Sequence, residues 1–462
     1  MLRHCTALVL LCGALAAGLA PPAAAQTKVP PINFKERALA NGMKVYTVQD
    51  KSSPTVSIQV WYKVGSKDDP EGRSGFAHLF EHLMFKSTKN MKDEMMDRLT
   101  EDVGGWNNAS TWDDFTNYYE VVPSNYLETL LWAEADRMGS LNVNDKNFPS
   151  ERDVVKEEFR SRILAPPYGR FLYSIEKNSY TTHPYRRPGI GSIENLDAAT
   201  LEDVRAFHKT FYRPDNATLV VVGDFEQKQL DGWIDKYFGR VPKPGTPLPR
   251  VTAKEPARTA EKRFNETGPN VPLPAVAITY LAPPVVSDDA YALRVAESIL
   301  SAGESSRLYQ SLVYKQQVAQ AAWVTADLRE DNGLVYFASI LASGKKPEEA
   351  ERALLAELKL MQDTPVSKAE LDKAVNQLVT NQLRERETNN GKADAIGRAA
   401  VLMGDASRVN SDIAKLQAVT AADVQRVMKK YFNDTNRVVI TYTGEPAKPQ
   451  ASDADAKKGE GR

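Results

Sequence analysis

The strongest constraint on the fold of this 462-residue chain is an internal repeat at a fixed spacing of 220 residues. Matched pairs run along the chain: Ile58 with Ile278, Leu196 with Leu416, Thr200 with Thr420, Asp203 with Asp423, and Asn216 with Asn436. A single register that matches near both ends of the repeat indicates duplication. We therefore predict two homologous halves built on the same plan.

Each half combines strands and helices. Residues 56–64 alternate between apolar and polar or exposed positions, which is the period of a half-buried strand, and residues 43–48 are predicted as its partner. Helical patterns follow at 74–86, 91–103, 124–138 and 147–164. Because strands and helices do not alternate strictly, we predict an α+β fold in which each half packs helices on one face of an antiparallel sheet.

The chain is predicted to divide at three places. Residues 1–25 have a short basic start, an apolar stretch too short for a membrane span and small residues before Gln26, which predicts a cleaved secretory signal peptide. The Pro-rich residues 241–258 predict a linker between a first domain (26–240) and a second (259–446). Residues 447–462 lack periodicity and predict a disordered tail.

This reading places the mature protein in the periplasm or outside the cell. Both cysteines, Cys5 and Cys12, fall in the predicted signal peptide, so the mature chain would have no disulfide and would depend on its apolar core. No later apolar run reaches membrane length. A formal net charge of −1 gives no basic footprint for nucleic acid.

The segment His78-Leu79-Phe80-Glu81-His82 carries the most specific chemistry. At about 100° per helical residue, Glu81 lies roughly 60° to one side of His78 and His82 roughly 40° to the other, so all three share one face. Two imidazoles suit a zinc ion whose catalytic site keeps one position open, and a nearby carboxylate can act as general base. The alternative is a helix with two structural histidines, which is disfavoured because only four histidines follow the signal peptide.

A third protein ligand must come from another segment. Glu151 and Glu158 are seven residues apart in a predicted helix and therefore share a stripe. One of them can bind the metal while the other supports the site. Spacing alone does not decide which glutamate binds, and it is also compatible with a solvated acidic face.

These segments resemble the pitrilysin, insulinase and mitochondrial processing peptidase family, whose His-x-x-Glu-His motif inverts the usual metallopeptidase order. The resemblance rests on residues 75–85, Asn-Ala-Ser-Thr at 108–111, Thr-Asn-Tyr-Tyr at 116–119, residues 151–158, and His-Pro-Tyr at 183–185. It implies zinc ligands His78, His82 and Glu158, with Glu81 as general base and Glu151 in support.

The resemblance also implies how substrate is held. Asn108 and Ala109 match the edge strand on which family members bind an extended peptide by β-augmentation. The halves would form part of a clam-shell chamber that admits short or unfolded peptides. One Zn²⁺ ion per chain is expected, since the 220-residue shift puts Ser298, Ser301 and Ala302 at the positions of the zinc motif.

The second half departs from the pattern of a complete active unit. The family places an Arg and a Tyr, seven apart, across the chamber to stabilise charge on the substrate carbonyl. Those positions are Val313 and Gln320 here. Arg307 and Tyr314 have the same spacing but break the alignment. We therefore expect a heterodimer with a homologous partner subunit that supplies the pair, with a homodimer as the alternative.

The function predicted from these observations is a zinc-dependent endopeptidase or oligopeptidase that acts on short or unfolded peptides. An alternative is a catalytically weak peptide-binding or scaffold subunit of a larger complex, which the intact zinc motif disfavours. Another zinc hydrolase, such as an amidase, is a third reading, and the edge-strand motif at Asn108 favours peptide substrates instead.

Overall fold

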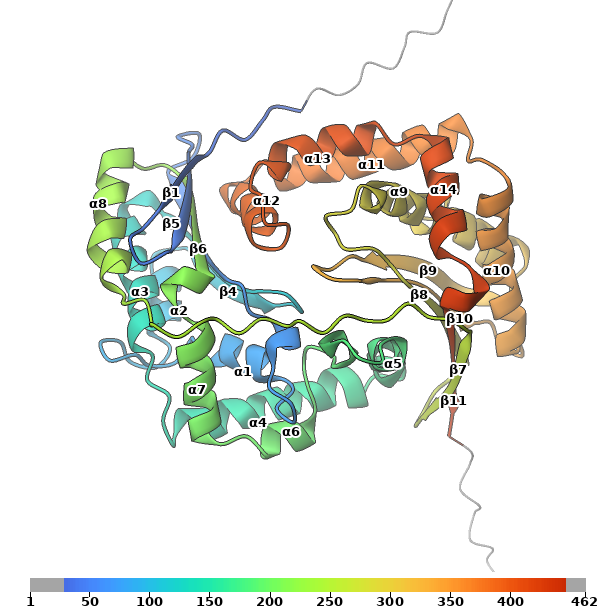
Figure 1. The fold of residues 1–462 in the computed structure, drawn as a ribbon, viewed down its shortest axis with the longest axis horizontal. Helices are drawn as coiled ribbons and strands as arrows, with labels where there is room; N and C mark the ends of the chain where they lie inside the picture. The colour runs from blue at the N-terminus through green and yellow to red at the C-terminus, as the bar shows by residue number, and fades with distance from the viewer. Residues whose placement is uncertain (1–28, 446–462) are drawn as a thin grey trace, which may run out of the picture. The chain divides into compact units, whose positions relative to one another are not determined.

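Two sheets organise the computed structural model, which describes residues 29–445 (Figure 1). The first has the strand order β1-β2-β6-β3-β5-β4 and the second the order β7-β11-β8-β10-β9. The first sheet consists of Lys35–Ala38 (β1), Lys44–Gln49 (β2), Thr55–Tyr62 (β3), Trp106–Thr111 (β4), Thr116–Pro123 (β5) and Ala217–Gly223 (β6). The second consists of Lys262–Gly268 (β7), Ala275–Leu281 (β8), Ala319–Asp327 (β9), Leu334–Leu341 (β10) and Arg437–Gly444 (β11).

Helices follow the strands in both halves. Those of the first half are Phe76–Leu83 (α1), Met95–Glu101 (α2), Leu127–Ser140 (α3), Asn147–Phe159 (α4), Gly169–Ser179 (α5), Ile193–Asp197 (α6), Leu201–Phe211 (α7) and Gln227–Tyr237 (α8). Those of the second half are Asp289–Ser301 (α9), Pro347–Asp363 (α10), Lys368–Glu385 (α11), Asn389–Val401 (α12), Arg408–Gln417 (α13) and Ala421–Tyr431 (α14). The predicted α+β class is confirmed.

The duplication is confirmed element by element. A shift of 220 residues carries α7 onto α14, β3 onto β8 and β6 onto β11 within one residue at each end. Even the helix starts agree, because Thr200 and Thr420 each accept a hydrogen bond from the Asp amide three residues later in a capping box. The repeat seen in the sequence is therefore a repeat of structure.

The predicted strand pairing was wrong in one respect, because each sheet is mixed rather than antiparallel. β2 runs parallel to β6, and β7 runs parallel to β11, whereas the other pairs are antiparallel. Parallel neighbours need a long connection between them. The segment between β2 and β6 and the segment between β7 and β11, each with further strands and several helices, provide that connection.

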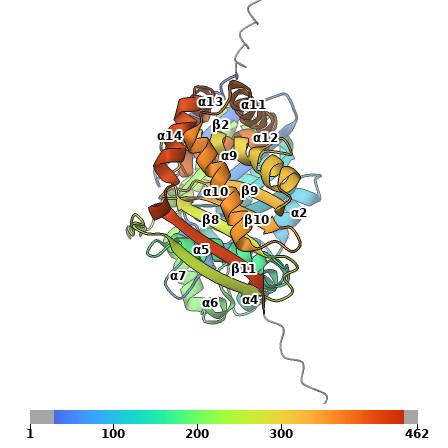
Figure 2. The ribbon, with the colours of Figure 1, turned by 90° about the vertical axis from the view of Figure 1, so that its right-hand side faces the viewer.

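The prediction that helices cover one face of each sheet was also incomplete. α12 from the second half packs on β3 and β6 of the first sheet, and α5 from the first half packs on the second sheet, as Figure 2 shows beside β7 and β11. β3 is consequently buried along both faces, not half-buried. The contact is close: a Cβ atom added to Gly397 of α12 would lie 2.2 Å from the ring of Trp61.

This exchange of helices joins the halves into one compact unit that, among the described residues, spans 32–445. Residues 241–258, predicted as a linker, contain no regular helix or strand. The predicted signal peptide (1–25) and tail (447–462) lie outside the described residues. Within residues 29–445, no helix has the length and apolar character needed to cross a bilayer.

Candidate metal centre

Helix α1 carries the histidine motif and begins at a constrained turn. The carboxylate of buried Asp69 accepts hydrogen bonds from the amides of Gly75 and Ala77, at 2.7 and 2.9 Å. Gly75 has a φ of 96°, and a Cβ atom there would lie 2.9 Å from the carbonyl oxygen of Ile190. Glycine is therefore required, and the start of α1 is held in one place.

The two faces of α1 differ in character. Leu79, Phe80 and Leu83 are buried in the core of the first half. His78, Glu81 and His82 are only partly buried on the remaining face. The helical spacing of the motif therefore places its two imidazoles and one carboxylate together, as the sequence predicts.

Packing of α4 against α1 brings Glu158 to the histidines. Its Oε2 atom lies 3.5 Å from Nε2 of His78 and 3.4 Å from Nε2 of His82. The three ligand atoms lie within 4.8 Å of one another, and no other such group of His, Cys, Asp or Glu occurs among residues 29–445. Two imidazole nitrogens and one carboxylate oxygen form the donor set of a three-ligand zinc site with an open position.

The other glutamate of the stripe lies behind the histidines. Oε2 of Glu151 is 3.7 Å from Nδ1 of His82, the ring nitrogen that faces away from Glu158. Its other oxygen is 3.0 Å from the ammonium group of Lys86. A carboxylate in this place orients a metal-binding imidazole and selects its tautomer.

Charges around the cluster shift the two histidines in opposite directions. Burial and the neighbouring His82 lower the pKa of His78 to about 4. Burial also disfavours a charged His82, but hydrogen bonds with Glu151 and Glu158 outweigh it and raise the pKa of His82 to about 9. In the metal-free chain at neutral pH, one imidazole is neutral and the other carries a proton that a metal ion would displace.

Two basic residues, Lys86 and Arg162, belong to the site although the sequence did not predict them there. Besides Lys86, Arg162 places its guanidinium 2.7 Å from Oε1 of Glu158, the oxygen that faces away from the histidines. Arg162 belongs to a π-helical turn, Arg160–Leu164, that continues α4 where a regular helix was predicted. Its spacing of four residues from Glu158 was the available signal.

Glu81 lies between the histidines and the edge of the first sheet. Burial raises the pKa of its carboxyl group, and hydrogen bonding to Thr111, the last residue of β4, partly opposes that rise. The hydroxyl of Thr111 also lies 3.5 Å from the carbonyl oxygen of Ala77 in α1. The predicted base is thus adjacent to the strand predicted to hold substrate.

That strand, β4, lies at the edge of the first sheet and pairs only with β5. Ala109 is buried against the core, whereas Asn108 is exposed. The amide of Ala109 donates to the side-chain oxygen of Asn108 at 2.8 Å. An added peptide strand would compete with this local hydrogen bond for the free edge.

Among residues 259–445, the second half holds no counterpart of the metal-ligand cluster. Ser298 and Ser301 of α9 stand at the positions of His78 and Glu81, and the same shift puts Leu378 of α11 at the position of Glu158. The hydroxyl of Ser301 donates to the carbonyl oxygen of Val324 in β9. These side chains support packing and not metal binding.

The second half does not offer the Arg and Tyr pair, either at the aligned positions or at the alternative positions Arg307 and Tyr314. Val313 is half-buried, and Gln320 is exposed on edge strand β9. Arg307 forms two hydrogen bonds to the carboxylate of Glu370, at 2.8 and 3.1 Å, so its guanidinium is already occupied. Tyr314 is 68% exposed.

The remaining histidines of the described chain lie outside the cluster. Nδ1 of buried His183 accepts a hydrogen bond from the amide of Tyr185, and its Nε2 is 3.4 Å from Asp331. The ring of His208 stacks on Phe80 and Tyr212. Both side chains have structural contacts.

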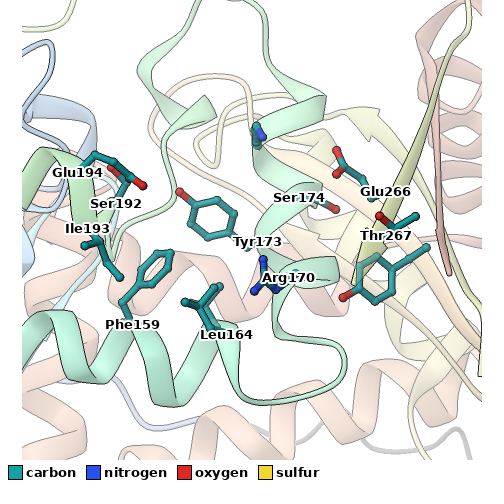
Figure 3. Close-up of a pocket in the computed structure, with 13 residues that line it drawn as sticks. Phe159, Leu164, Arg170, Tyr173, Ser174, Ser192, Ile193, Glu194, Glu266 and Thr267 are labelled. Atoms are coloured by element: carbon teal, nitrogen blue, oxygen red, sulfur yellow. The ribbon is translucent and has the colours of Figure 1, made fainter. Parts of the chain in front are cut away.

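A cavity of about 420 Å³ begins one residue beyond Glu158, with Phe159 in its wall (Figure 3). Its other walls come from α5, the start of α6, β7 and Tyr442 of β11. None of the predicted metal ligands lines it. This cavity is therefore separate from the metal-ligand cluster.

Two protein-family models match this chain, one in each half. Residues 44–166 match the family described as Insulinase (Peptidase family M16), and residues 198–378 match the Peptidase M16 inactive domain. The description of the second match agrees with the loss of the motif histidines from α9.

Individual relatives cover most of the chain. The zinc protease PqqE of Helicobacter pylori is 31% identical over 407 residues, covering 87% of this chain and 91% of the relative. A probable mitochondrial-processing peptidase subunit beta of Arabidopsis thaliana is 24% identical and covers 86% of this chain and 76% of its own. The crystal structure of a protease from Helicobacter pylori superposes with a TM-score of 0.86 at 30% identity, over 90% of this chain and all of that one.

Proposed function

Because the chain belongs to the insulinase family (peptidase family M16), we propose that it is a zinc-dependent endopeptidase or oligopeptidase that cleaves short or unfolded peptides. The observation that carries this proposal is the convergence of His78, His82 and Glu158 on one point beside an edge strand. Peptide binding along a free edge needs little sequence specificity, because main-chain groups make the hydrogen bonds.

In this proposal His78, His82 and Glu158 hold one zinc ion per chain. When bound, zinc lowers the pKa of a water molecule to about 7 and polarises the peptide carbonyl. Glu81 takes the proton from the attacking water and delivers it to the leaving amine. The raised pKa of Glu81 suits both steps, because a base and acid works best when its pKa lies near the working pH.

Glu151 and Arg162 hold this arrangement in place. Glu151 faces the far nitrogen of His82 and directs the other nitrogen toward the metal. Arg162 occupies the outer oxygen of Glu158 and leaves the inner oxygen for the metal. Asn108 and Ala109 receive the substrate main chain on β4 once the local hydrogen bond between them is released.

We also propose that full activity requires a homologous partner subunit. Val313 and Gln320 offer no positive charge or phenol to a developing oxyanion, and Arg307 is paired with Glu370. A partner would supply such groups across a shared chamber, with a homodimer as the alternative assembly. The predicted signal peptide supports secretion into the periplasm or beyond.

The experiment measures peptide cleavage by the mature chain, alone and mixed with a candidate partner, with bound zinc quantified in each sample. We expect one zinc ion per chain, strong cleavage only in the mixture, and loss of cleavage with retained zinc in Glu81→Gln. Strong cleavage by the chain alone would reject the need for a partner. Zinc binding without cleavage in any sample would support the alternative, a peptide-binding or scaffold subunit.

A further inference from the structure

Helices α9, α11, α12 and α13 of the second half lie near one another (Figure 1). Residues of these four helices line a second cavity, of about 680 Å³. In the internal repeat, α9 and α11 take the places of α1 and α4, the helices that carry the metal-ligand cluster.

Four arginines line this cavity, which we call the arginine pocket: Arg294, Arg386, Arg398 and Arg408. Two of them have carboxylate partners. Nε of Arg398 donates to Asp394 at 2.7 Å, and Arg408 lies 3.5 Å from Asp412 and donates to the hydroxyl of Tyr291.

The other two arginines are not neutralised by a bonded carboxylate. Half-buried Arg294 makes no hydrogen bond or ion pair with any residue between 29 and 445, but its charge opposes the burial that raises the pKa of the Glu297 carboxyl, three residues later in α9. Arg386 donates to the carbonyl oxygen of Val409 at 2.5 Å, and burial lowers its pKa. Glu385 and Asp412, which also line the pocket, interact with Arg386 only through space. A partly desolvated guanidinium without a bonded carboxylate is costly, and a carboxylate with two parallel acceptor oxygens is its best partner.

The pocket continues toward the strand that is proposed to hold peptide. The guanidinium of Arg398 lies 5.4 Å from the ring centroid of Trp112 and 5.6 Å from that of Phe115. Trp112 follows directly on Thr111, the end of β4, and is 50% exposed. Arg398 therefore connects the arginine pocket with the end of the peptide-binding edge.

We propose that the arginine pocket is a subsite for a carboxylate of the peptide bound on β4. This inference rests on the proposed function, because it requires a peptide on that edge. The carboxylate belongs either to an Asp or Glu side chain or to the free C-terminus of the peptide. Both sources present the same planar, bidentate acceptor to a guanidinium.

Binding to the full mature, zinc-loaded chain tests this subsite, with Glu81→Gln introduced to prevent cleavage. The probes are fluorescent 12-residue peptides of otherwise neutral sequence. One set carries a single Asp at successive positions with an amidated C-terminus, a matched set carries Asn, and a third carries Asn with a free C-terminus. We expect at least one Asp position, or the free C-terminus, to tighten binding roughly tenfold, as a charge-assisted contact should.

Variants of the chain test whether the tighter binding of peptides with a carboxylate depends on the arginine pocket. Arg294→Gln should abolish the preference for a carboxylate, Arg294→Lys should keep part of it, and Arg384→Gln should keep all of it. Arg384 is a matched control because it is exposed on the same helix, α11, and does not line the cavity. Thermal unfolding of each variant separates lost binding from lost folding.

The experiment distinguishes failure of the arginine pocket from failure of the proposed peptidase function. Equal binding of all peptides, or a preference that survives Arg294→Gln in a folded protein, overturns the arginine pocket even where the unmodified chain cleaves peptides. A preference for the Asp series assigns the ligand to a side chain, and a preference for the free acid assigns it to the C-terminus. Absence of both binding and cleavage overturns the arginine pocket and the proposed function together.

Discussion

Zinc binding at pH 7 should release about one proton from the protein, besides roughly half a proton from a zinc-bound water whose pKa is about 7, and Glu151→Gln should suppress much of the release from the protein. His82 is the source, because its hydrogen bonds to Glu151 and Glu158 outweigh burial and raise its pKa to about 9. His78, with its pKa lowered to about 4, is already neutral. Only a neutral imidazole binds zinc, so the proton on His82 must leave.

The magnitude follows from the distance between the pKa and the pH. A group whose pKa lies two units above the pH is almost fully protonated, and removing its proton costs about 2.7 kcal/mol. Below about pH 9, the proton on His82 should therefore lower the apparent zinc affinity roughly tenfold for each pH unit, in addition to the pH dependence that the bound water contributes. At an ordinary pKa of about 6.5, the release from His82 at pH 7 would be roughly a quarter of a proton, so the release from this residue in the variant should lie between that value and one.

Calorimetry in two buffers of different ionisation enthalpy measures the number of protons released. Glu157→Gln is the matched control, since Glu157 lies on the same helix, is exposed and pairs with Arg160 instead of a histidine. A release of roughly half a proton or less by the unmodified chain, which the bound water alone would account for, would refute the reasoning. An unchanged release in Glu151→Gln would show that this carboxylate does not set the charge of His82.

Other variants test the contact between Arg162 and Glu158 and the packing of α12 on the first sheet. Arg162→Gln should weaken zinc binding roughly tenfold by freeing the outer oxygen of Glu158, whereas Arg160→Gln should not, and competition with a chelator measures both. Equal affinities would remove Arg162 from the site. Gly397→Ala should lower the free energy of unfolding by about 1–3 kcal/mol because its methyl group meets an indole ring at 2.2 Å. Gly239→Ala, where the added Cβ meets nothing within 4 Å, should have little effect in the same denaturation experiment.

The spacing of residues within the motif was enough to predict that one face of α1 carries both histidines and the glutamate. His78, Glu81 and His82 fall within one sector of any α-helix, so their proximity does not depend on the rest of the chain. The spacing did not determine which glutamate is the third ligand. Spacing put Glu151 and Glu158 on one stripe, and only the angle at which α4 packs on α1 places Glu158 between both histidines and Glu151 behind one of them.

The sequence did not predict the contact of Arg162 with Glu158 or the arginine pocket. Arg162 reaches Glu158 from a π-helical turn, which the apolar periodicity of a regular helix does not reveal. The arginine pocket collects side chains from four helices between residues 285 and 416. Long-range packing of that kind leaves no fixed spacing to read.

The sequence by itself determined the duplication, the α+β class and the face of the histidine helix, because each is a periodicity along the chain. Only the tertiary structure decided the parallel strand pairs and the exchange of α5 and α12 between the halves. The physical reason is that an apolar run such as Thr218 to Val222 shows that both faces of a strand are buried, but does not show which element covers them. That choice is made by the shape of distant surfaces, as where Trp61 packs against Gly397.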